Sequence, residues 1–236
     1  DAFAKACEIQ KATGAVFLHP FDDEYVIAGQ GTIGLEILEQ LDGKVDTILC
    51  PIGGGGIIAG IAVAAKGINP NIKIVGVQTA NIPSMQESMK NGEVTTAFKY
   101  TTIADGIAVK TPGDVTFEII NELVDEVVVV EEDEIAQGML FLMENQKVVA
   151  EGAGAVTTAA LLSGKYVPKK YENVVCVISG GNVDVNTLYR VIGTALTKEA
   201  RRYSFNTVIQ DKPGGLAELT KIISEYDANI LSANLS

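Results

Sequence analysis

The chain has 236 residues, of which 47% are hydrophobic and 20% are charged, a balance typical of a folded globular protein rather than a disordered one. Thirty acidic residues outnumber eighteen basic ones, and the net charge at pH 7 is −12. That sign repels nucleic acids and anionic membranes, so we expect neither as a partner. Because Cys7, Cys50 and Cys176 lie far apart, we expect free thiols in a reducing, cytoplasmic setting.

Apolar runs alternate with helical patterns along the first 200 residues. Strands separated by helices of this length predict an α/β fold, with an open parallel sheet and helices on both faces. Ligands of such sheets bind beyond the carboxyl ends of the strands. The predicted helices cover residues 1–13, 23–41, 57–66, 83–92, 111–123, 131–145, 151–162 and 185–200, and the predicted strands cover residues 15–19, 44–51, 73–78, 125–130 and 171–178.

One uncharged stretch, Thr47–Ala65, is long enough to imitate a membrane-spanning helix. It contains Pro51 and four successive glycines, which would interrupt such a helix. A buried parallel strand followed by a buried helix explains the stretch better.

The four glycines, Gly53–Gly56, stand between the apolar runs at residues 47–50 and 57–65. This order predicts a strand, a glycine turn and a helix. Glycines can turn their amides inward with no Cβ in the way, and the helix adds free N–H groups and a positive dipole end. The loop therefore suits a phosphate, although a tightly packed turn would leave the same pattern.

The residues around the loop indicate which class of phosphate-bearing ligand it suits. Ile57 and Ile58 occupy the places where a nucleotide-triphosphate loop carries Lys and Ser or Thr. Gly54, Gly56 and Ala59 do match the dinucleotide pattern, but the next strand ends in the uncharged Gln78 instead of an acidic residue. A cofactor with a single phosphate therefore fits better than NAD.

A second glycine motif, Gly29–Gly34, has the full dinucleotide spacing. The preceding residues 22–28 begin with acidic side chains and do not form a convincing strand. We therefore predict that these glycines allow close packing of a helix.

Five short motifs occur in a fixed order, and together they resemble the serine/threonine dehydratase family of fold type II pyridoxal phosphate enzymes. The resemblance covers about residues 1–198 and is strongest to the threonine-directed members. It implies that residues 1–22 end a small domain and that residues 23–202 form the large cofactor-binding domain. The motifs are Gly29–Thr32, Pro51–Gly56, Ile103–Gly106, Glu151–Ala155 and Ile178–Asp184.

The resemblance assigns the cofactor's phosphate to Gly53, Gly54, Gly55 and Gly56 with the amide of Ile57. Pyridoxal 5'-phosphate is the implied cofactor. A single phosphate group is what the glycine loop suits on physical grounds.

The resemblance also assigns residues around the cofactor ring. Ser179 would bond the pyridine nitrogen, and a hydroxyl there gives a weaker electron sink, which suits β-elimination. Gly106 would line the same pocket. Glu151 is either a pocket carboxylate or the acidic start of its helix. His19, the only histidine, is expected to be structural.

Two departures from the family pattern bear on chemistry. The family's Schiff-base lysine lies in a Ser-Phe-Lys motif that this sequence lacks, as it lacks the family's asparagine-bearing substrate loop. We expect the chain to be the downstream part of a longer enzyme and inactive alone. Gln78 and Ser84 replace the acidic metal ligands of some relatives, so we expect no metal.

Residues 203–236 resemble the opening half of an ACT regulatory domain. A strand at 203–209, a helix to about Tyr226 and a strand from Asn229 flank an Asp-x-Pro-Gly-x-Leu signature. A simple βαβ extension of the preceding domain is the alternative. Arg201 and Arg202 would form either a hinge or a solvated basic pair.

In ACT modules an effector lies near the loop between the first strand and helix. Here Asp211, Gly214, Gly215 and Leu216 form that loop, and open amides of the two glycines would suit an amino-acid carboxylate. The resemblance implies a homo-oligomer that responds to a branched-chain amino acid.

The implied reaction of the longer enzyme is β-elimination and deamination of L-threonine to 2-oxobutanoate and ammonia, with serine giving pyruvate. A serine racemase or serine dehydratase is the alternative within the enzyme class. A non-catalytic amino-acid-binding regulator is the alternative outside it, and an upstream lysine would distinguish the two.

Overall fold

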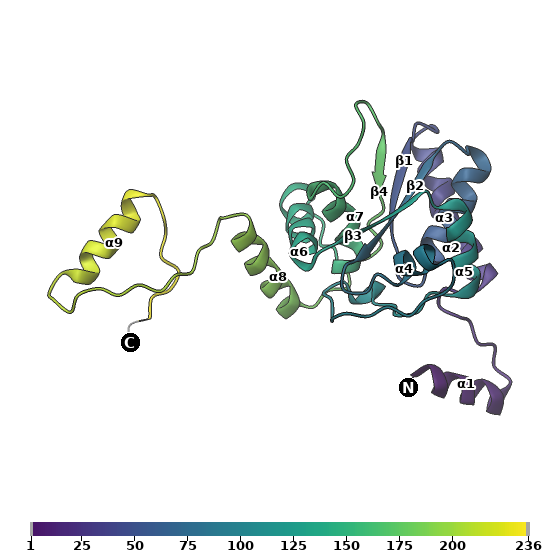
Figure 1. Ribbon diagram of the computed structural model, residues 1–236, viewed down its shortest axis with the longest axis horizontal. Coiled ribbons are helices and arrows are strands. Elements are labelled where there is room, and N and C mark those ends of the chain that lie inside the picture. The colour runs from purple at the N-terminus through teal and green to yellow at the C-terminus, as the bar shows by residue number, and fades with distance from the viewer. Residues whose placement is uncertain (1, 235–236) are drawn as a thin grey trace. The chain divides into compact units, whose positions relative to one another are not determined.

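The computed structural model describes residues 2–234, and the chain divides into two compact units, Asp1–Arg202 and Tyr203–Ser236. The larger unit is built on a four-stranded parallel sheet in the order β3-β2-β1-β4 (Figure 1). The predicted open parallel α/β fold is confirmed. The strands are β1 (Thr47–Pro51), β2 (Lys73–Thr79), β3 (Glu126–Val130) and β4 (Val174–Cys176).

Helices cover both faces of the sheet, and the alternation of side chains along β1 decides which residues meet which layer. Leu49 packs with α6, α7 and α8, whereas Ile48 and Cys50 pack with α2, α3 and α5 on the opposite face (Figure 1). All three side chains are fully buried. The helices of this unit are α1 (Ala2–Thr13), α2 (Glu24–Gln40), α3 (Gly56–Ile68), α4 (Ser84–Asn91), α5 (Asp114–Leu123), α6 (Glu132–Phe141), α7 (Gly152–Leu162) and α8 (Val185–Lys198), with a 3₁₀ turn η1 (Asp105–Ile107) and a π turn η2 (Leu142–Gln146).

The second glycine motif lies inside α2, as predicted, and faces α3. A Cβ on Gly31 would stand 3.1 Å from the carbonyl oxygen of Gly60, and a Cβ on Gly60 only 2.4 Å from that of Ile27. The two backbones approach so closely that side chains larger than hydrogen have no room. The uncharged stretch forms β1 and α3, and no helix among the described residues could cross a membrane.

The predicted strand at residues 15–19 is wrong, because these residues are irregular. Val16 and Leu18 are exposed, and no neighbouring strand within residues 2–234 offers them backbone partners. His19 has the structural role that was expected and gains partners that the sequence did not reveal: its Nδ1 accepts hydrogen bonds from the amides of Asp22 (2.8 Å) and Phe21 (3.4 Å).

Other boundaries also differ from the prediction. Strands β1 and β4 are shorter than expected, because only the residues that pair across them keep strand geometry. The helix predicted for residues 131–145 ends as the π turn η2, which closes on Lys147 in a left-handed conformation at φ 59°.

The cysteines are free: Cys50 is buried, and Cys7 and Cys176 are half-buried. Burial raises the pKa of Cys50, and it raises the pKa of Cys176 to about 11. Neither thiol is therefore a reactive thiolate near neutral pH.

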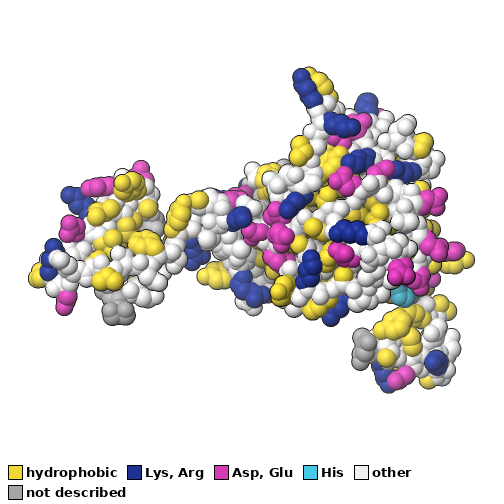
Figure 2. All heavy atoms as spheres, viewed as in Figure 1, with side chains coloured by type: hydrophobic (Ala, Val, Ile, Leu, Met, Phe, Trp, Pro, Cys, Tyr) yellow, Lys and Arg dark blue, Asp and Glu magenta, His cyan; other side chains and the backbone are white. Residues whose placement is uncertain are grey.

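Among its described residues, the smaller unit contains one helix, α9 (Gly215–Glu225). The two strands predicted at 203–209 and from Asn229 do not form in the described part of this unit. Tyr203, Phe205 and Val208 stay exposed, and Figure 2 shows uncovered apolar side chains on the visible face of this unit. Isolated strand segments without a packed partner are marginal in water, which explains the difference.

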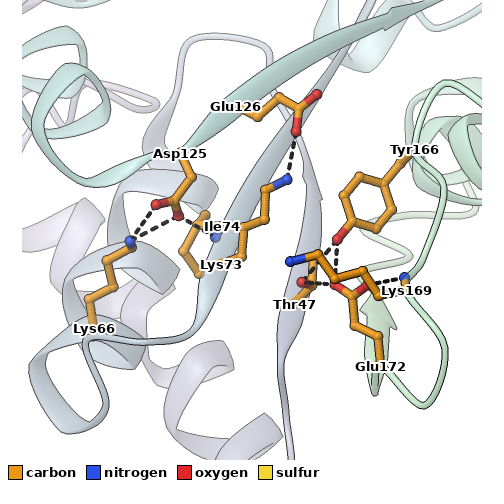
Figure 3. Close-up of polar contacts among 9 residues, drawn as sticks. All are labelled: Thr47, Lys66, Lys73, Ile74, Asp125, Glu126, Tyr166, Lys169 and Glu172. Carbon is orange, nitrogen blue, oxygen red and sulfur yellow. Dashed lines mark hydrogen bonds and ion pairs between the residues drawn. The ribbon is translucent and has the colours of Figure 1, made fainter.

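A polar cluster fastens the amino-terminal edge of the sheet, at the start of β1 (Figure 3). The carboxylate of Glu172 accepts hydrogen bonds from Thr47 Oγ1 and Tyr166 Oη, both 2.5 Å, and from the amide of Lys169. The hydrogen bonds from Thr47 and then Tyr166 lower the pKa of Glu172 to about 2. The cluster ties the loop before β4 to β1.

Two ion pairs extend this edge toward β3 (Figure 3). Lys66 on α3 contacts Asp125 at 2.8 Å, and Asp125 also accepts the amide of Ile74 at 2.7 Å. Lys73 contacts Glu126 at 2.7 Å across the neighbouring strands. These contacts support the parallel register of β2 and β3 on the edge opposite the glycine loop.

We predict that Glu172→Gln lowers the free energy of unfolding by about 1–2 kcal/mol at pH 7, because charged hydrogen bonds are lost at a partly exposed site. A depressed carboxyl pKa stabilises the fold above the unfolded value, and that contribution disappears as the pH falls from about 4.5 to about 2. Urea unfolding at several pH values measures the difference. The exposed Glu118→Gln should show no such difference, and a pH-independent effect of Glu172→Gln would contradict the assignment.

Candidate functional site

The glycine loop lies at the carboxyl end of the central strand β1 and leads into α3. Gly55 is the residue before the helix and has φ 102°, a conformation that glycine adopts without strain. Gly54, Gly55 and Gly56 are buried. A Cβ on Gly54 would fall 2.3 Å from the ring of Phe21, so the loop also needs glycine for space.

The amides of the loop have no partner in the described part of the protein. Within residues 2–234, no hydrogen bond joins the N–H groups of Gly53–Ile57 to a protein acceptor, whereas Ile52 and Ala59 on either side are paired. Buried N–H groups without partners are rare, because desolvating them costs free energy. Successive unpaired amides at a helix N-terminus suit a bound anion, and a phosphate above all.

Motifs far apart in sequence converge beside this loop. A Cβ on Gly53 would stand 3.5 Å from the carbonyl oxygen of Gly106, and a Cβ on Gly106 would stand 3.3 Å from Glu151 Oε1. Glu151 Oε2 accepts the amide of Asn182 at 3.1 Å, and the Glu151 amide donates to the carbonyl of Gly180 at 3.1 Å. Gly53, Gly106, Glu151 and Gly180 therefore form one continuous site.

The first turn of α7 lies between two of these loops. This position explains why its residues are small. A Cβ on Gly152 would stand 2.4 Å from the carbonyl oxygen of Ile103, and one on Gly154 would stand 2.5 Å from that of Gly180. Glu151 precedes the helix but makes no side-chain hydrogen bond to it. Its carboxylate turns to the loop at Asn182 instead.

Ser179 lies at the same edge of the sheet as the glycine loop. Strand β4 pairs in parallel with β1, and the amide of Val177 still donates to the carbonyl of Leu49 at 3.0 Å. Parallel neighbours carry their following loops to one edge, so Ser179 follows β4 where Gly53 follows β1. The Ser179 side chain is exposed there.

A polar cavity of about 330 Å³ adjoins Glu151 and Asn182. Glu132 on its wall accepts the amide of Ile103 at 2.8 Å and so fixes that loop. The hydrogen bond from Thr187 lowers the pKa of Asp184, which caps α8. Among the described residues no lysine lines the cavity, whose walls are Thr101, Thr102, Ile103, Asp105, Glu132, Glu151, Gly152, Asn182, Val183, Asp184, Thr187 and Arg190.

Gln78 and Ser84, the positions considered for metal, are both buried. The Gln78 side-chain oxygen accepts the amide of Gln86 at 2.9 Å, and Ser84 donates to the carbonyl of Val109 at 2.7 Å. Residues 2–234 contain no group of His, Cys, Asp and Glu side chains arranged to hold a metal ion.

In the smaller unit, Gly214 precedes α9 at φ 93°, and Asp211 and Leu216 are exposed. One detail of the effector prediction is wrong. The amide of Gly215 is not open, because it donates to the carbonyl of Lys212 at 3.2 Å in a turn that the sequence did not reveal. In the larger unit, Arg201 forms an ion pair with Glu144 at 2.9 Å, and Arg202 is the last residue before the smaller unit begins.

Three residues that contact the glycine loop or its surroundings were not predicted from the sequence. Phe21 covers Gly54 and Gly56, Asp22 accepts the amides of Asp114 and Thr116, and the Thr116 hydroxyl donates to Gly54. The only local signal is the Pro-Phe-Asp-Asp run before α2, which reads as a helix start.

A central parallel strand, a glycine loop whose amides have no partner among the described residues and a helix N-terminus are the features of α/β proteins suited to hold an anion at the carboxyl edge of the sheet. The family model described as "Pyridoxal-phosphate dependent enzyme" matches residues 1–180. The chain belongs to this family.

Relatives of known name extend the comparison. The chain is 52% identical over 232 residues to the L-threonine ammonia-lyase of Thermotoga maritima, covering 98% of this chain and 57% of the relative. It is 51% identical over 196 residues to the catabolic L-threonine dehydratase TdcB of Escherichia coli K12, covering 82% of this chain and 59% of that protein. The chain thus spans less than two thirds of the curated relatives it matches.

Solved structures agree on the fold. Maize serine racemase superposes with a TM-score of 0.74 at 37% identity, covering 84% of this chain and 61% of the other. The processed form of threonine deaminase isoform 2 from Solanum lycopersicum superposes with a TM-score of 0.75 at 37% identity, covering 81% of this chain and 56% of the other.

The residues present fit pyridoxal phosphate. The group carries one phosphate, and the loop offers amides without partners among the described residues, buried glycines and the N-terminus of α3 for one anion. The polar cavity beside Glu151 is lined by none of these loop residues, so the fit rests on the loop itself.

We predict that Gly154→Ala destabilises the chain by about 1–3 kcal/mol, because the new Cβ meets a backbone carbonyl that cannot move alone. The matched control is Gly67→Ala on α3, where a Cβ meets nothing within 4 Å. That change should be neutral or should stabilise by up to about 1 kcal/mol. Urea unfolding compares the two, and equal stabilities of both variants would contradict the close approach of α7 to Gly180.

Proposed function

We propose that the protein is a pyridoxal-phosphate dependent L-threonine ammonia-lyase and that this chain provides its phosphate-binding core. The observation that carries the proposal is the row of largely buried amides at Gly53–Ile57, unpaired within residues 2–234, in a family whose members use that cofactor. The identity of 52% to an L-threonine ammonia-lyase supports threonine as the substrate, and serine is proposed as a second one.

Each candidate residue has a role in this proposal. The amides of Gly53, Gly54, Gly55, Gly56 and Ile57 hold the cofactor's phosphate. Bound pyridoxal phosphate supplies the electron sink for charge that develops at the substrate's Cα.

The other candidates surround the ring. Ser179 offers its hydroxyl to the pyridine nitrogen from the loop after β4, and Gly106 lines the ring's edge without a side chain. Glu151 orders the loop of Ser179 through its contacts with Gly180 and Asn182. The products of threonine would be 2-oxobutanoate and ammonia, and serine would give pyruvate.

The Schiff-base lysine belongs, in this proposal, to the part of the longer relatives that this chain does not span. No lysine of the described chain lines the polar cavity, and the Ser-Phe-Lys motif is absent from the sequence. The 236-residue chain would then bind the cofactor's phosphate without turning over threonine.

We expect Gly55→Asp to weaken binding of pyridoxal phosphate by about 100-fold or more, because a carboxylate would stand beside the phosphate and a Cβ would meet Ile120 at 2.7 Å. Equilibrium dialysis of the chain measures the binding, and 2-oxobutanoate release by the longer protein measures activity. Gly67→Asp, the same change at an exposed helical glycine, is the control. Undiminished binding by Gly55→Asp, or turnover by the 236-residue chain alone, would contradict the proposal.

Serine racemase is the second candidate, because the maize enzyme superposes on 84% of this chain. The sequence relatives at about 50% identity are threonine enzymes, which favours ammonia release. D-serine formation from L-serine without keto-acid release would favour the racemase. A non-catalytic regulator would show neither product.

We further propose a cytoplasmic homo-oligomer regulated by a branched-chain amino acid through an ACT module that begins at Tyr203. The free cysteines support a reducing compartment, and the bend at Gly214 before α9 supports a carboxylate-binding turn. Asp211, Gly215 and Leu216 would complete that loop. Effector and substrate would then alter each other's affinity reciprocally.

We predict that isoleucine or valine shifts the threonine saturation curve of the longer protein by about 5-fold or more, the usual range of coupling between sites. Gly214→Asp should abolish the shift, because a carboxylate would repel that of the effector. Gly67→Asp should retain it. If neither amino acid moves the curve, or if Gly214→Asp responds like the unsubstituted protein, the effector site is wrong.

A further inference from the structure

A buried hydroxyl on α5 anchors the glycine loop. Thr116, in the first turn of α5, is fully buried, and its Oγ1 donates a hydrogen bond of 2.6 Å to the carbonyl oxygen of Gly54. A second acceptor, the carbonyl of Gly113, lies 3.2 Å away within the same turn. The shorter contact joins α5 to the loop.

This contact fixes more than one atom, because the peptide between Gly54 and Gly55 is planar and trans. In a trans peptide the carbonyl and the following N–H point in opposite directions. Holding the Gly54 carbonyl toward Thr116 therefore turns the Gly55 N–H toward the opposite side. The Gly55 amide is among those without a partner in residues 2–234.

Thr116 also bounds the loop sterically. A Cβ on Gly55 would stand 2.9 Å from Thr116 Cβ and 2.7 Å from Ile120 Cδ1. These two α5 side chains close the space behind Gly55, so the peptide has little freedom to turn over. The hydrogen bond and the packing both restrain the orientation of the peptide plane between Gly54 and Gly55.

Thr116 is itself held by a residue far away in sequence. Asp22 Oδ1 accepts the Thr116 amide at 3.1 Å, and Oδ2 accepts the Asp114 amide at 3.2 Å. Gly113 at the start of α5 makes no side-chain cap of its own, so Asp22 satisfies the helix in its place. Next to Asp22, Phe21 covers Gly54 and Gly56.

We propose that Thr116 is a positioning residue for the phosphate cradle: its hydroxyl sets the Gly54–Gly55 peptide so that the Gly55 N–H is available to an anion. Asp22 supports it by fixing the first turn of α5. The inference rests on the proposed role of the glycine loop in holding the cofactor's phosphate.

The test compares variants of the full chain in two measurements. Thr116→Val removes the hydroxyl and keeps the shape, and Thr116→Ser restores the hydroxyl. Ser88→Ala is the matched control, because Ser88 is equally buried and donates to a backbone carbonyl in α4 at 2.7 Å, away from the loop. Equilibrium dialysis gives the affinities for pyridoxal phosphate and inorganic phosphate, and urea unfolding gives stability.

Thr116→Val should weaken both affinities about tenfold, the effect of one average hydrogen bond, and Thr116→Ser should stay within about twofold of the unsubstituted chain. Ser88→Ala should lower stability and leave both affinities unchanged. Unchanged binding by Thr116→Val, or equal weakening by Ser88→Ala, would overturn the inference.

A Gly55→Asp arm separates this inference from the proposed function. If Gly55→Asp loses binding while Thr116→Val keeps it, the loop is the phosphate site and only the role of Thr116 is wrong. If the unsubstituted chain binds neither probe, or if Gly55→Asp binds both normally, the proposed function and this inference fail together.

Discussion

The structure depends on a loop whose backbone amides are buried without partners in the described chain. Leaving such groups unpaired costs about 1–3 kcal/mol each, so the surroundings must hold the loop in place. Strand β1 fixes its beginning and α3 its end, and α3 is fixed in turn by backbone contact with α2 at Gly31 and Gly60. A bound anion would satisfy the amides, so the same feature that strains the free chain suits it for a ligand.

Close backbone approach is the common device around the site. Gly54 accommodates Phe21, Gly152 accommodates the Ile103 carbonyl, and Gly154 accommodates the Gly180 carbonyl. Gly152 and Gly154 let two backbones meet without a side chain between them, and Gly54 leaves room for the Phe21 ring. The short motifs are therefore mutually dependent, since none could adopt its position with a larger residue.

The two edges of the sheet differ in how far their polar groups are satisfied by hydrogen bonds. The amino-terminal edge is fastened by Glu172 with its donors and by the ion pairs of Lys66 and Lys73, and these polar groups satisfy one another (Figure 3). The carboxyl edge leaves the amides of the glycine loop unsatisfied by any described residue. The stability contributed by the polar contacts at one edge offsets the cost of amides without partners at the other.

The sequence by itself determined the parallel α/β class, the glycine loop between a buried strand and a helix, and the helical glycines of α2, because local spacing and apolar periodicity encode them. Tertiary structure decided what spacing does not encode. It brought Asp22 into contact with the start of α5, Thr116 into contact with Gly54 and Glu151 into contact with Asn182. These contacts cross 94, 62 and 31 positions of the chain. It also left residues 15–19 and 203–209 without strands, because an apolar alternation becomes a strand only where another strand offers backbone partners.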